Sequence, residues 1–568
     1  MQGMTKKWLD PPQKIFSLSA IERILHARGF EDEKAQVSFL ESKLSSLSKP
    51  ESIPGVADAA RILKTAIESN SKILIFGDYD ADGITASAVL FHIINTATDQ
   101  ADISIHIPDR VNDGYGLRVN AIKRFKEQEV DLIITVDCGI TALEAAQKAK
   151  EFGISLIVTD HHQLREDGLL PQCAAIAHPC INGNKGEPLA GVGVAYMLAW
   201  AFAREWSGGE EVTKELKRIL LDLLPLAAIG TVADMVPLQG DNRIIAKWGI
   251  NMLTESKIDG IQAILNEMNL KAHLKASDIS FKIAPLLNAI GRLGHAGPAV
   301  DLLTTLQGPS AASVASDLAS INRKRQVIQK EIFSQAQKAV DLQQLHKKPI
   351  VILKDSDWER GVVGVVAGKC AELYYRPTIL FVDEGAKLIG SARSISGFSI
   401  LDALNNCSEF LDEFGGHDMA AGVTLNLNHF DSFVQAMEKY TEQCIDIDSL
   451  VPTVSPDIDL TVEECKGIAV TEFFKLFPFG VGNKAPVVTI RNVNVDEVKR
   501  FGSKGVHLSL KIGSSRSRIR CVWWGHGNKI ELLNRGTRIS VIGKLGVNDF
   551  NGHQTIEINL EDLSLPSA

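Results

Sequence analysis

Short apolar runs alternate with helix-length segments in the first third of the chain. Four such runs lie between residues 70 and 160, and each has the length of a buried strand. The segment 141–152 between the last two has the spacing of an amphipathic helix. Buried strands that alternate with helices predict a parallel sheet covered on both faces. The four runs are Ile73–Phe76, Ile103–Ile107, Leu132–Val136 and Ile154–Val158.

The pattern changes three times after this sheet. Residues 190–275 predict mainly helices, and residues 310–345 contain neither Gly nor Pro, which predicts one long helix. A second strand–helix alternation starts at Pro349, and short strands with turns follow from about residue 452. The fold class is therefore α/β with a doubly wound parallel sheet. We expect a helical lead-in over 1–50, the sheet lobe over 51–305, a linking helix over 306–346, a second α/β lobe over 347–450 and a basic β module over 451–568.

Composition narrows the class of protein. The 568 residues are too many for one core, and 45% apolar with 23% charged residues is ordinary for globular chains. The N-terminal residues lack the apolar stretch of a signal peptide, and no run is long enough to span a bilayer. The eight cysteines form no CxxC pair, which argues against a zinc site or a disulfide framework. We expect a protein of the reducing cytoplasm.

Charge is distributed unevenly along the chain. The net charge is −9, but residues 491–550 hold twelve Lys and Arg against four acids, about +8. Such a local excess favours binding of a polyanion, although a single charge of this kind is equally explained by a solvated strand face. Two tryptophans, Trp523 and Trp524, lie within this stretch, and Arg323-Lys324-Arg325 lie on the linking helix. A charged groove with stacking aromatics binds single strands, and we expect at least one of the tryptophans to be buried instead.

Acidic residues follow several of the predicted strands. Asp78, Asp80 and Asp82 follow the first run, Asp137 follows the third, and Asp160-His161-His162 follow the fourth. The carboxyl ends of parallel strands share one edge, where ligands bind. Each acid alone is more often a helix N-cap or a turn residue. Together with a His pair they favour a site for divalent cations, Mg²⁺ or Mn²⁺, and imidazole shifts the preference toward Mn²⁺. Asp234 ends a further apolar stretch.

Several ordered motifs carry a family resemblance that extends from about residue 45 to the C-terminus. DYDADG (78–83), VDCG (136–139), TDHH (159–162) and GTVADMVPL (230–238) resemble the four motifs of the DHH phosphoesterase superfamily. NAIGRL (288–293), GVVGVVAGK (361–369), GSARS (390–394) and GGHDMAAG (415–422) resemble its associated second lobe. FPFGVGN (477–483) and the basic β tail, which is similar to an OB-like barrel, complete the pattern of the RecJ family. The chain departs from this family in having Glu359-Arg360 after Trp358, where a His is usual.

The resemblance implies a single-strand-specific exonuclease that removes mononucleotides from the 5′ end of DNA in recombination and repair. Single-strand-binding protein and a helicase are the protein partners it suggests, with no membrane and no nucleotide cofactor. It implies two Mn²⁺ or Mg²⁺ ions. The implied metal ligands are Asp78, Asp80, Asp82, Asp137 (as the bridge), His161 and Asp234. Asp160 would orient the imidazoles, His162, Arg292 and His417 would act in catalysis, and Arg110, Asn288, Ser391 and Arg393 would bind phosphate or DNA.

Other interpretations of the sequence are weaker. Gly191-Val192-Gly193 is half of a dinucleotide fingerprint without the third Gly, so a close helix approach explains it better. FGSKG (501–505) is no Walker sequence, which argues against ATP dependence. A phosphodiesterase for cyclic dinucleotides or short oligonucleotides is the alternative enzyme, but such relatives generally lack the linking helix and basic tail. A non-catalytic DNA-binding scaffold, like the eukaryotic helicase component of the superfamily, ranks last because every metal-binding acid is present.

Overall fold

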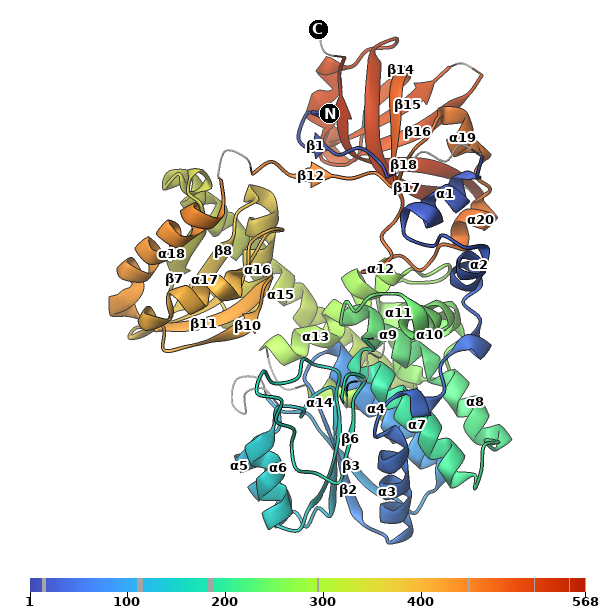
Figure 1. Ribbon diagram of the computed structural model, residues 1–568, viewed down its shortest axis with the longest axis vertical. Coiled ribbons are helices and arrows are strands. Elements are labelled where there is room, and N and C mark those ends of the chain that lie inside the picture. The colour runs from blue at the N-terminus through green and yellow to red at the C-terminus, as the bar shows by residue number, and fades with distance from the viewer. Residues whose placement is uncertain are drawn as a thin grey trace. The chain divides into compact units, whose positions relative to one another are not determined.

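The chain folds into two compact units in the computed structural model (Figure 1). One unit combines Met1–Arg28, Arg323–Ile468 and Pro486–Ala568, and the other combines Gly29–Asn322 and Ala469–Ala485. No helix in the described ranges is both long and apolar enough to cross a membrane. The structure describes residues 1–12, 17–109, 116–181, 183, 188–293, 296–446, 450–514, 516–550 and 552–566, with only the backbone for 292 and 293.

A five-stranded parallel sheet forms the centre of the second unit. Its strand order is β3-β2-β4-β5-β6, and every neighbouring pair is parallel. The order reverses at β2, which is the arrangement of a doubly wound sheet, so the predicted fold class is confirmed. The three-residue strand β6 was not predicted because its apolar run is too short to stand out. The strands are β2 (Lys72–Gly77), β3 (Asp102–His106), β4 (Leu132–Val136), β5 (Ser155–Thr159) and β6 (Ala175–Ala177).

Helices cover both faces of this sheet, so alternate residues of a strand belong to different hydrophobic cores. Ile73 and Ile75 of β2 belong to the core under one helical layer, whereas Leu74 and Phe76 belong to the core on the other face. Burial on both faces explains why the strands are almost wholly apolar. The first layer contains α3 (Val56–Glu68), α4 (Ala81–Ala97) and α7 (Gly191–Trp206), and the other contains α5 (Val119–Glu127) and α6 (Leu143–Glu151) (Figure 1).

A helical region extends the first layer, as the sequence predicted for residues 190–275. Its central helix, α9 (Leu224–Ala233), is buried from Leu224 to Val232, packs against α4 and α10, and ends at Asp234. The apolar stretch before Asp234 is therefore a core helix. The other helices are α8 (Lys214–Asp222), α10 (Gly240–Met252), α11 (Asp259–Glu267), α12 (Ala276–Asp278), α13 (Ala284–Leu293) and α14 (Gly297–Thr304), with a π-helical turn at Ile279–Ile283.

Residues 469–485, which contain the FPFGVGN motif, are built into this same unit. The guanidinium of Arg243, only 1% exposed, donates to the carbonyl oxygens of Lys475, Leu476 and Phe477 at 2.9–3.3 Å. It also stacks over the Phe39 ring at 3.8 Å. Further along the motif, the carbonyl of Val481 accepts from Leu238 N at 2.7 Å, and a Cβ on Gly480 would lie 2.7 Å from the Leu238 side chain. The motif therefore braces the loop that follows Asp234.

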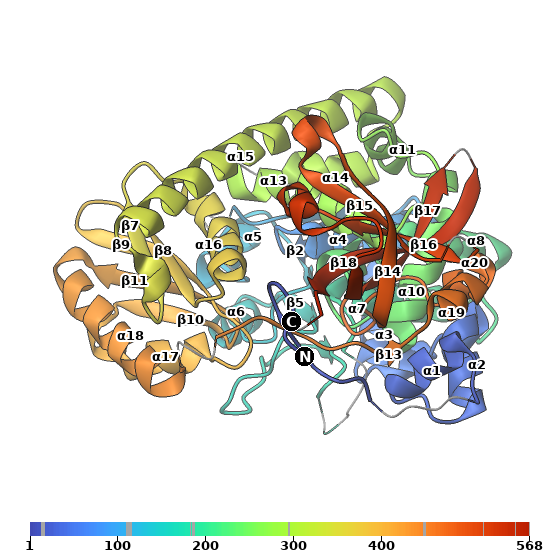
Figure 2. The same cartoon turned by 90° about the horizontal axis from the view of Figure 1, so that it is seen from above.

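The other unit contains most of the long helix, two larger sheets and a short parallel pair of strands, β1 (Lys7–Trp8) with β12 (Thr453–Val454). Helix α15 (Gly308–Leu342) is one continuous helix, as predicted, although its first residues belong to the parallel-sheet unit (Figure 2). The second lobe has a mixed sheet of order β10-β11-β9-β8-β7. Its strands are β7 (Val351–Asp355), β8 (Thr378–Asp383), β9 (Lys387–Arg393), β10 (Glu413–His417) and β11 (Ala420–Asn426), with helices α16 (Arg360–Tyr374), α17 (Ile400–Asn406) and α18 (Phe430–Cys444).

The C-terminal module is a β-barrel. Its strands follow the order β14-β15-β16-β18-β17, and pairing of β14 with β17 closes the barrel. Residues 1–28 fold with this module's unit, where Trp8 Nε1 donates to Asp562 Oδ2 at 2.8 Å, whereas residues 29–50 fold with the parallel sheet. The strands are β14 (Val487–Phe501), β15 (His507–Gly513), β16 (Arg518–Trp523), β17 (Arg538–Phe550) and β18 (His553–Ser564).

Candidate active site

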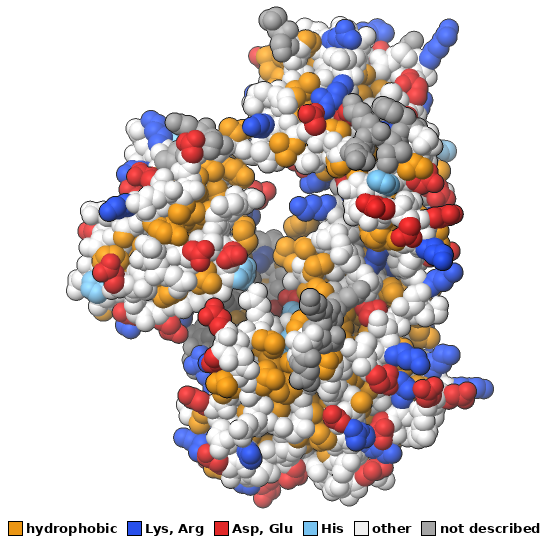
Figure 3. Space-filling view, in the orientation of Figure 1, with side chains coloured by type: hydrophobic (Ala, Val, Ile, Leu, Met, Phe, Trp, Pro, Cys, Tyr) orange, Lys and Arg blue, Asp and Glu red, His pale blue; other side chains and the backbone are white. Residues whose placement is uncertain are grey.

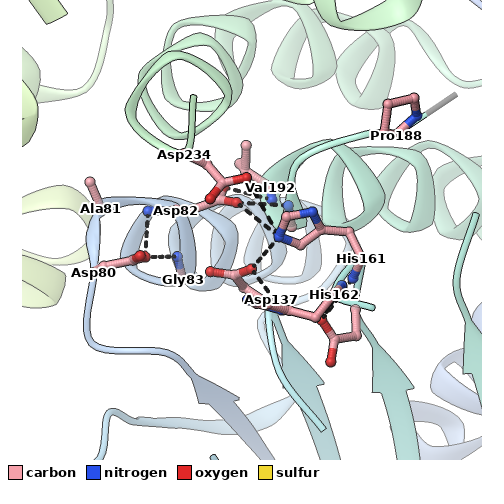
Figure 4. Close-up of polar contacts among 12 residues, drawn as sticks. Asp80, Ala81, Asp82, Gly83, Asp137, His161, His162, Pro188, Val192 and Asp234 are labelled. Atoms are coloured by element: carbon pink, nitrogen blue, oxygen red, sulfur yellow. Dashed lines mark hydrogen bonds and ion pairs between the residues drawn. The ribbon is translucent and has the colours of Figure 1, made fainter. Parts of the chain in front are cut away.

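The acidic residues meet at the carboxyl edge of the parallel sheet, as Figure 4 shows. Asp137 follows β4 directly, and Asp234 arrives from the end of α9. Asp80 is the N-cap of α4, where its Oδ1 accepts from Asp82 N at 2.9 Å and from Gly83 N at 3.1 Å. Asp80 is therefore a helix N-cap, as a single acid after a strand often is, and its carboxyl group also belongs to the acidic cluster.

Three overlapping groups of ligand atoms define the cluster. Within each group the atoms lie within 4.8 Å of one another, close enough to share one cation. Asp137 belongs to two groups and His161 to two, so these residues connect the three. The groups are Asp137, His161 and His162; Asp82, His161 and Asp234; and Asp78, Asp80 and Asp137.

The His161 imidazole points toward three of the carboxylates (Figure 4). Its Nε2 is 3.1 Å from Asp137 Oδ1, 3.5 Å from Asp234 Oδ2 and 4.0 Å from Asp82 Oδ2. Burial, and then the charge of His162, lowers the pKa of His161 to about 4, so the ring is neutral and Nε2 can ligate. Asp137 Oδ1 and His161 Nε2 are both buried, and neither has a hydrogen-bond partner within the described ranges. Buried polar atoms without partners indicate a missing ligand.

Two backbone groups that the sequence analysis missed hold Asp82. Gly191 N donates to Asp82 Oδ2 at 2.7 Å and Val192 N donates to Asp82 Oδ1 at 2.9 Å, both from the first turn of α7. A Cβ on Gly191 would lie 2.4 Å from Asp137 Oδ1, and one on Gly230 would lie 2.6 Å from Asp82 Oδ1. The close helix approach expected for Gly191-Val192-Gly193 is therefore present, and it places a helix N-terminus against the acids.

Burial and mutual repulsion raise the pKa values of the clustered carboxyl groups. Burial, and then the charges of neighbouring carboxylates, raises the pKa values of Asp82 and Asp137 well above the usual range. Burial, and then the charge of Asp80, raises the pKa of Asp234 to about 7. Without a cation, the cluster holds protons at neutral pH. A divalent cation that displaced them would remove the repulsion.

This competition between protons and metal predicts a pH-dependent stabilisation. A carboxyl with a raised folded pKa stabilises the metal-free protein at acidic pH and loses that contribution as the pH rises toward 7, whereas metal binding strengthens over the same range. We expect the increase in melting temperature on adding Mn²⁺ to be larger at pH 8 than at pH 6. Calorimetry at the two pH values, with the release of protons measured in buffers of different ionisation enthalpy, checks this. An equal increase at both values would contradict it.

Asp160 and His162 form a hydrogen-bonded pair at the margin of the cluster. His162 Nδ1 lies 2.7 Å from Asp160 Oδ1, and the other oxygen of Asp160 accepts from Ile140 N at 2.9 Å. Burial alone would lower the pKa of His162, but the hydrogen bond and charge of Asp160 outweigh it and raise that pKa to about 9. Burial would raise the pKa of Asp160, and its bonds with His162 and Ile140 lower it instead. His162 is therefore an imidazolium ion at neutral pH.

The other expected site residues are distributed over several elements of the two units. Asn288 on α13 accepts from Ala81 N at 2.6 Å and so holds the start of α4. In the second lobe, Ser391 and Arg393 lie on β9 against α16, since a Cβ on Gly364 would be 3.1 Å from Ser391 Oγ and 3.0 Å from an Arg393 nitrogen. His417 on β10 is exposed, and its Nδ1 accepts from Met419 N at 3.2 Å. Arg110 and the side chain of Arg292 lie outside the described residues, and the roles of all six stay predictions.

Aromatic rings gather on the C-terminal barrel. Trp523 is buried and Trp524 is 53% exposed, which matches the expectation that at least one of the two is buried. The Trp524 ring lies 4.8 Å from the ring of His507 and 5.5 Å from that of Phe501, and its Nε1 donates to Asn559 at 3.0 Å. These contacts hold a large exposed aromatic face in place, as stacking with nucleic-acid bases requires.

Much of the barrel's positive charge is paired with acids. Basic and acidic side chains are mixed over the visible face of this module (Figure 3). The twelve Lys and Arg lie within residues 491–550. The next strand, β18, carries acids that form ion pairs with basic residues of the neighbouring strands. Asp496 and Glu497 of β14 pair with Arg518, Arg535, Lys499 and Lys511, and Glu557 and Glu561 of β18 pair with Arg520 and Lys544.

Comparison with known proteins finds relatives over nearly the whole chain. Residues 72–231 match the DHH family N-terminal domain, 347–443 the DHHA1 domain and 456–562 the RecJ OB domain. The single-stranded-DNA-specific exonuclease RecJ of Bacillus subtilis is 34% identical over 96% of this chain and 68% of its own length. The crystal structure of RecJ with Mn²⁺ from Thermus thermophilus superposes with a TM-score of 0.82 at 28% identity, covering 99% of this chain and 80% of that one. The corresponding Mg²⁺ complex gives 0.74 at 27% identity, covering 99% and 79%.

Proposed function

Because the chain belongs to the RecJ family of single-stranded-DNA-specific exonucleases, we propose that it removes mononucleotides from the 5′ end of unpaired DNA in recombination and repair. The family assignment makes it a metal-dependent exonuclease that acts on single strands. The polarity, the product and the roles of individual residues are the proposed part. We propose that it works in the cytoplasm, in keeping with the eight cysteines, all described and all free.

One observation carries the proposal: Asp82, Asp137 and Asp234 lie within 4.0 Å of the neutral His161 imidazole, and Asp78 and Asp80 join the same cluster through Asp137. Buried acids with raised pKa values, and an unpartnered His161 Nε2, fit hard divalent cations. Relatives of this chain contain Mn²⁺ or Mg²⁺. We propose that these five acids and His161 hold two such ions, with Asp137 between them.

Bound cations of this kind acidify water and neutralise the charge that develops on phosphate. The chain's own groups supply the rest of the chemistry. Asp160 keeps His162 protonated and fixes its ring, so a positive imidazolium beside the cluster would stabilise the oxygens of the scissile phosphate. Arg292 and His417 would add charge stabilisation. The backbone N–H groups of Gly191 and Val192 hold Asp82 in one orientation.

Other residues would bind the strand rather than cut it. Arg110, Asn288, Ser391 and Arg393 would bind the terminal phosphate or the DNA, since Arg can bind two phosphate oxygens at once. The exposed ring of Trp524 would stack on a base. Single-strand-binding protein and a helicase are the proposed protein partners, and no nucleotide cofactor is proposed.

Degradation of end-labelled DNA tests the proposal. Single strands labelled at the 5′ or the 3′ end are incubated with the protein and Mn²⁺ or Mg²⁺, with a chelator as the control. We expect labelled mononucleotides at once from the 5′ label, a ladder of shortened strands from the 3′ label, and resistance of blunt duplex. Mononucleotides released first from the 3′ label would refute the polarity, and cleavage of dinucleotides alone would place the protein with the phosphodiesterases instead.

A further inference from the structure

His178 lies at the same sheet edge as the cluster, although no motif contains it. It directly follows β6 and is only 1% exposed. Among the described hydrogen bonds, its ring contacts backbone atoms and none of the metal-binding acids. Its backbone N donates to Pro54 O at 3.2 Å, and Asp160 N donates to the carbonyl of the preceding residue, Ala177, at 3.2 Å. The backbone on both sides of the His178 ring is therefore anchored to the sheet lobe.

The two ring nitrogens of His178 have different partners, which fixes the tautomer. Cys180 N donates to Nδ1 at 3.0 Å, so Nδ1 is an acceptor and carries no proton. The proton is then on Nε2, which donates to the carbonyl oxygen of His162 at 2.9 Å. A neutral ring with this tautomer satisfies both contacts, and a buried ring with both satisfied has one orientation.

This contact completes the support of His162. Asp160 Oδ1 accepts from His162 N at 3.1 Å and lies 2.7 Å from the His162 ring nitrogen Nδ1. Asp160 thus holds the amide and the ring, and His178 holds the carbonyl oxygen. Without His178, the peptide after His162 could rotate, and the ring would leave the position that its bond to Asp160 requires.

We propose that His178 is a positioning residue that fixes the backbone of His162, and through it the position of the His162 ring. This inference rests on the proposed function and deepens it. His178 touches neither substrate nor metal in this role. Groups that orient a functional imidazole typically change activity by about 10- to 100-fold when they are lost.

Two substitutions separate the hydrogen bond from the packing. His178→Phe keeps the ring volume and removes the donor, whereas His178→Gln keeps an amide N–H that can reach the same carbonyl. We expect His178→Phe to lower kcat by about 10- to 100-fold, with the KM for single-stranded DNA and the Mn²⁺ concentration for half-maximal activity unchanged. His178→Gln should recover most of the loss. Melting temperatures of both variants show whether folding is affected.

A double-mutant cycle provides the decisive measurement. If His178 acts through His162, adding His178→Phe to His162→Ala should cost less than about twofold in kcat. A further loss of tenfold or more, or a wild-type rate for folded His178→Phe, would overturn the inference. If His178→Phe does not fold, His178→Leu, which also lacks the donor, gives the same comparison alone and combined with His162→Ala. Failure of the wild-type protein to cut single strands would refute the proposed function instead.

Discussion

Asp137→Asn is expected to abolish DNA cleavage while leaving strand binding intact. Asp137 belongs to two of the three groups of ligand atoms, and its Oδ1 lies 3.1 Å from His161 Nε2. An amide has no charge to balance a divalent cation, so the site loses metal and the cleavage rate should fall by at least about 1,000-fold. That exceeds the 10- to 100-fold typical of groups that only orient a ligand. Single-turnover cleavage in Mn²⁺, with strand affinity measured in a chelator, checks both parts.

The stability of the same variant distinguishes a lost ligand from a lost fold. Asp137 is one of several buried carboxylates that raise one another's pKa values, so its removal relieves repulsion in the metal-free protein. We therefore expect metal-free Asp137→Asn to melt no lower than the wild type, and to gain less than the wild type when Mn²⁺ is added. Asp167→Asn, an exposed acid paired with Arg165, is the matched control and should behave as wild type. A folded Asp137→Asn protein with a tenth or more of wild-type activity would contradict the metal assignment.

The parallel sheet was predictable because four of its strands correspond to apolar runs of four or five residues, long enough to stand out in the sequence. Each predicted strand lies within one residue of an observed one, and the acids that follow them converge because parallel strands end at one edge. Strand β6 was not predicted because three residues are too few for a pattern. Once β6 is known, the same rule places His178 at this edge, since the residue after Ala175–Ala177 is polar. His178 was missed because a single His after so short a run gives no signal by itself.

Other parts of the site could not be found in the sequence because backbone atoms form them. The amides of Gly191 and Val192 hold Asp82, and only a three-dimensional arrangement brings α7 to α4. The charge of the C-terminal barrel shows a related limit. Its basic residues were counted over a window of sequence, whereas strand pairing brings Glu557 and Glu561 of β18 to Arg520 and Lys544. The net charge of residues 491–550 therefore overstates the positive charge of the folded barrel, which also contains the acids of β18.

His162→Ala is expected to lower kcat by about 100- to 10,000-fold, the range for loss of a positioned proton-bearing group. The ring of His162 is held by Asp160 at 2.7 Å, and its proposed contact is with the scissile phosphate alone, so we expect KM to change little. Steady-state rates on single-stranded DNA of one length measure both constants. A fall in kcat of less than tenfold would remove His162 from the catalytic mechanism.

The pH dependence of kcat tests the same assignment from another direction. Asp160 raises the pKa of His162 to about 9 in the metal-free protein, and activity that needs the protonated ring is lost as the pH rises through this pKa. Cations beside the ring lower its pKa, and removal of the Asp160 charge lowers it further. Asp160→Asn should therefore move the alkaline limb of the kcat profile to lower pH, and His162→Ala should abolish that limb. An alkaline limb that stays in place in Asp160→Asn would show that a group other than His162 titrates there.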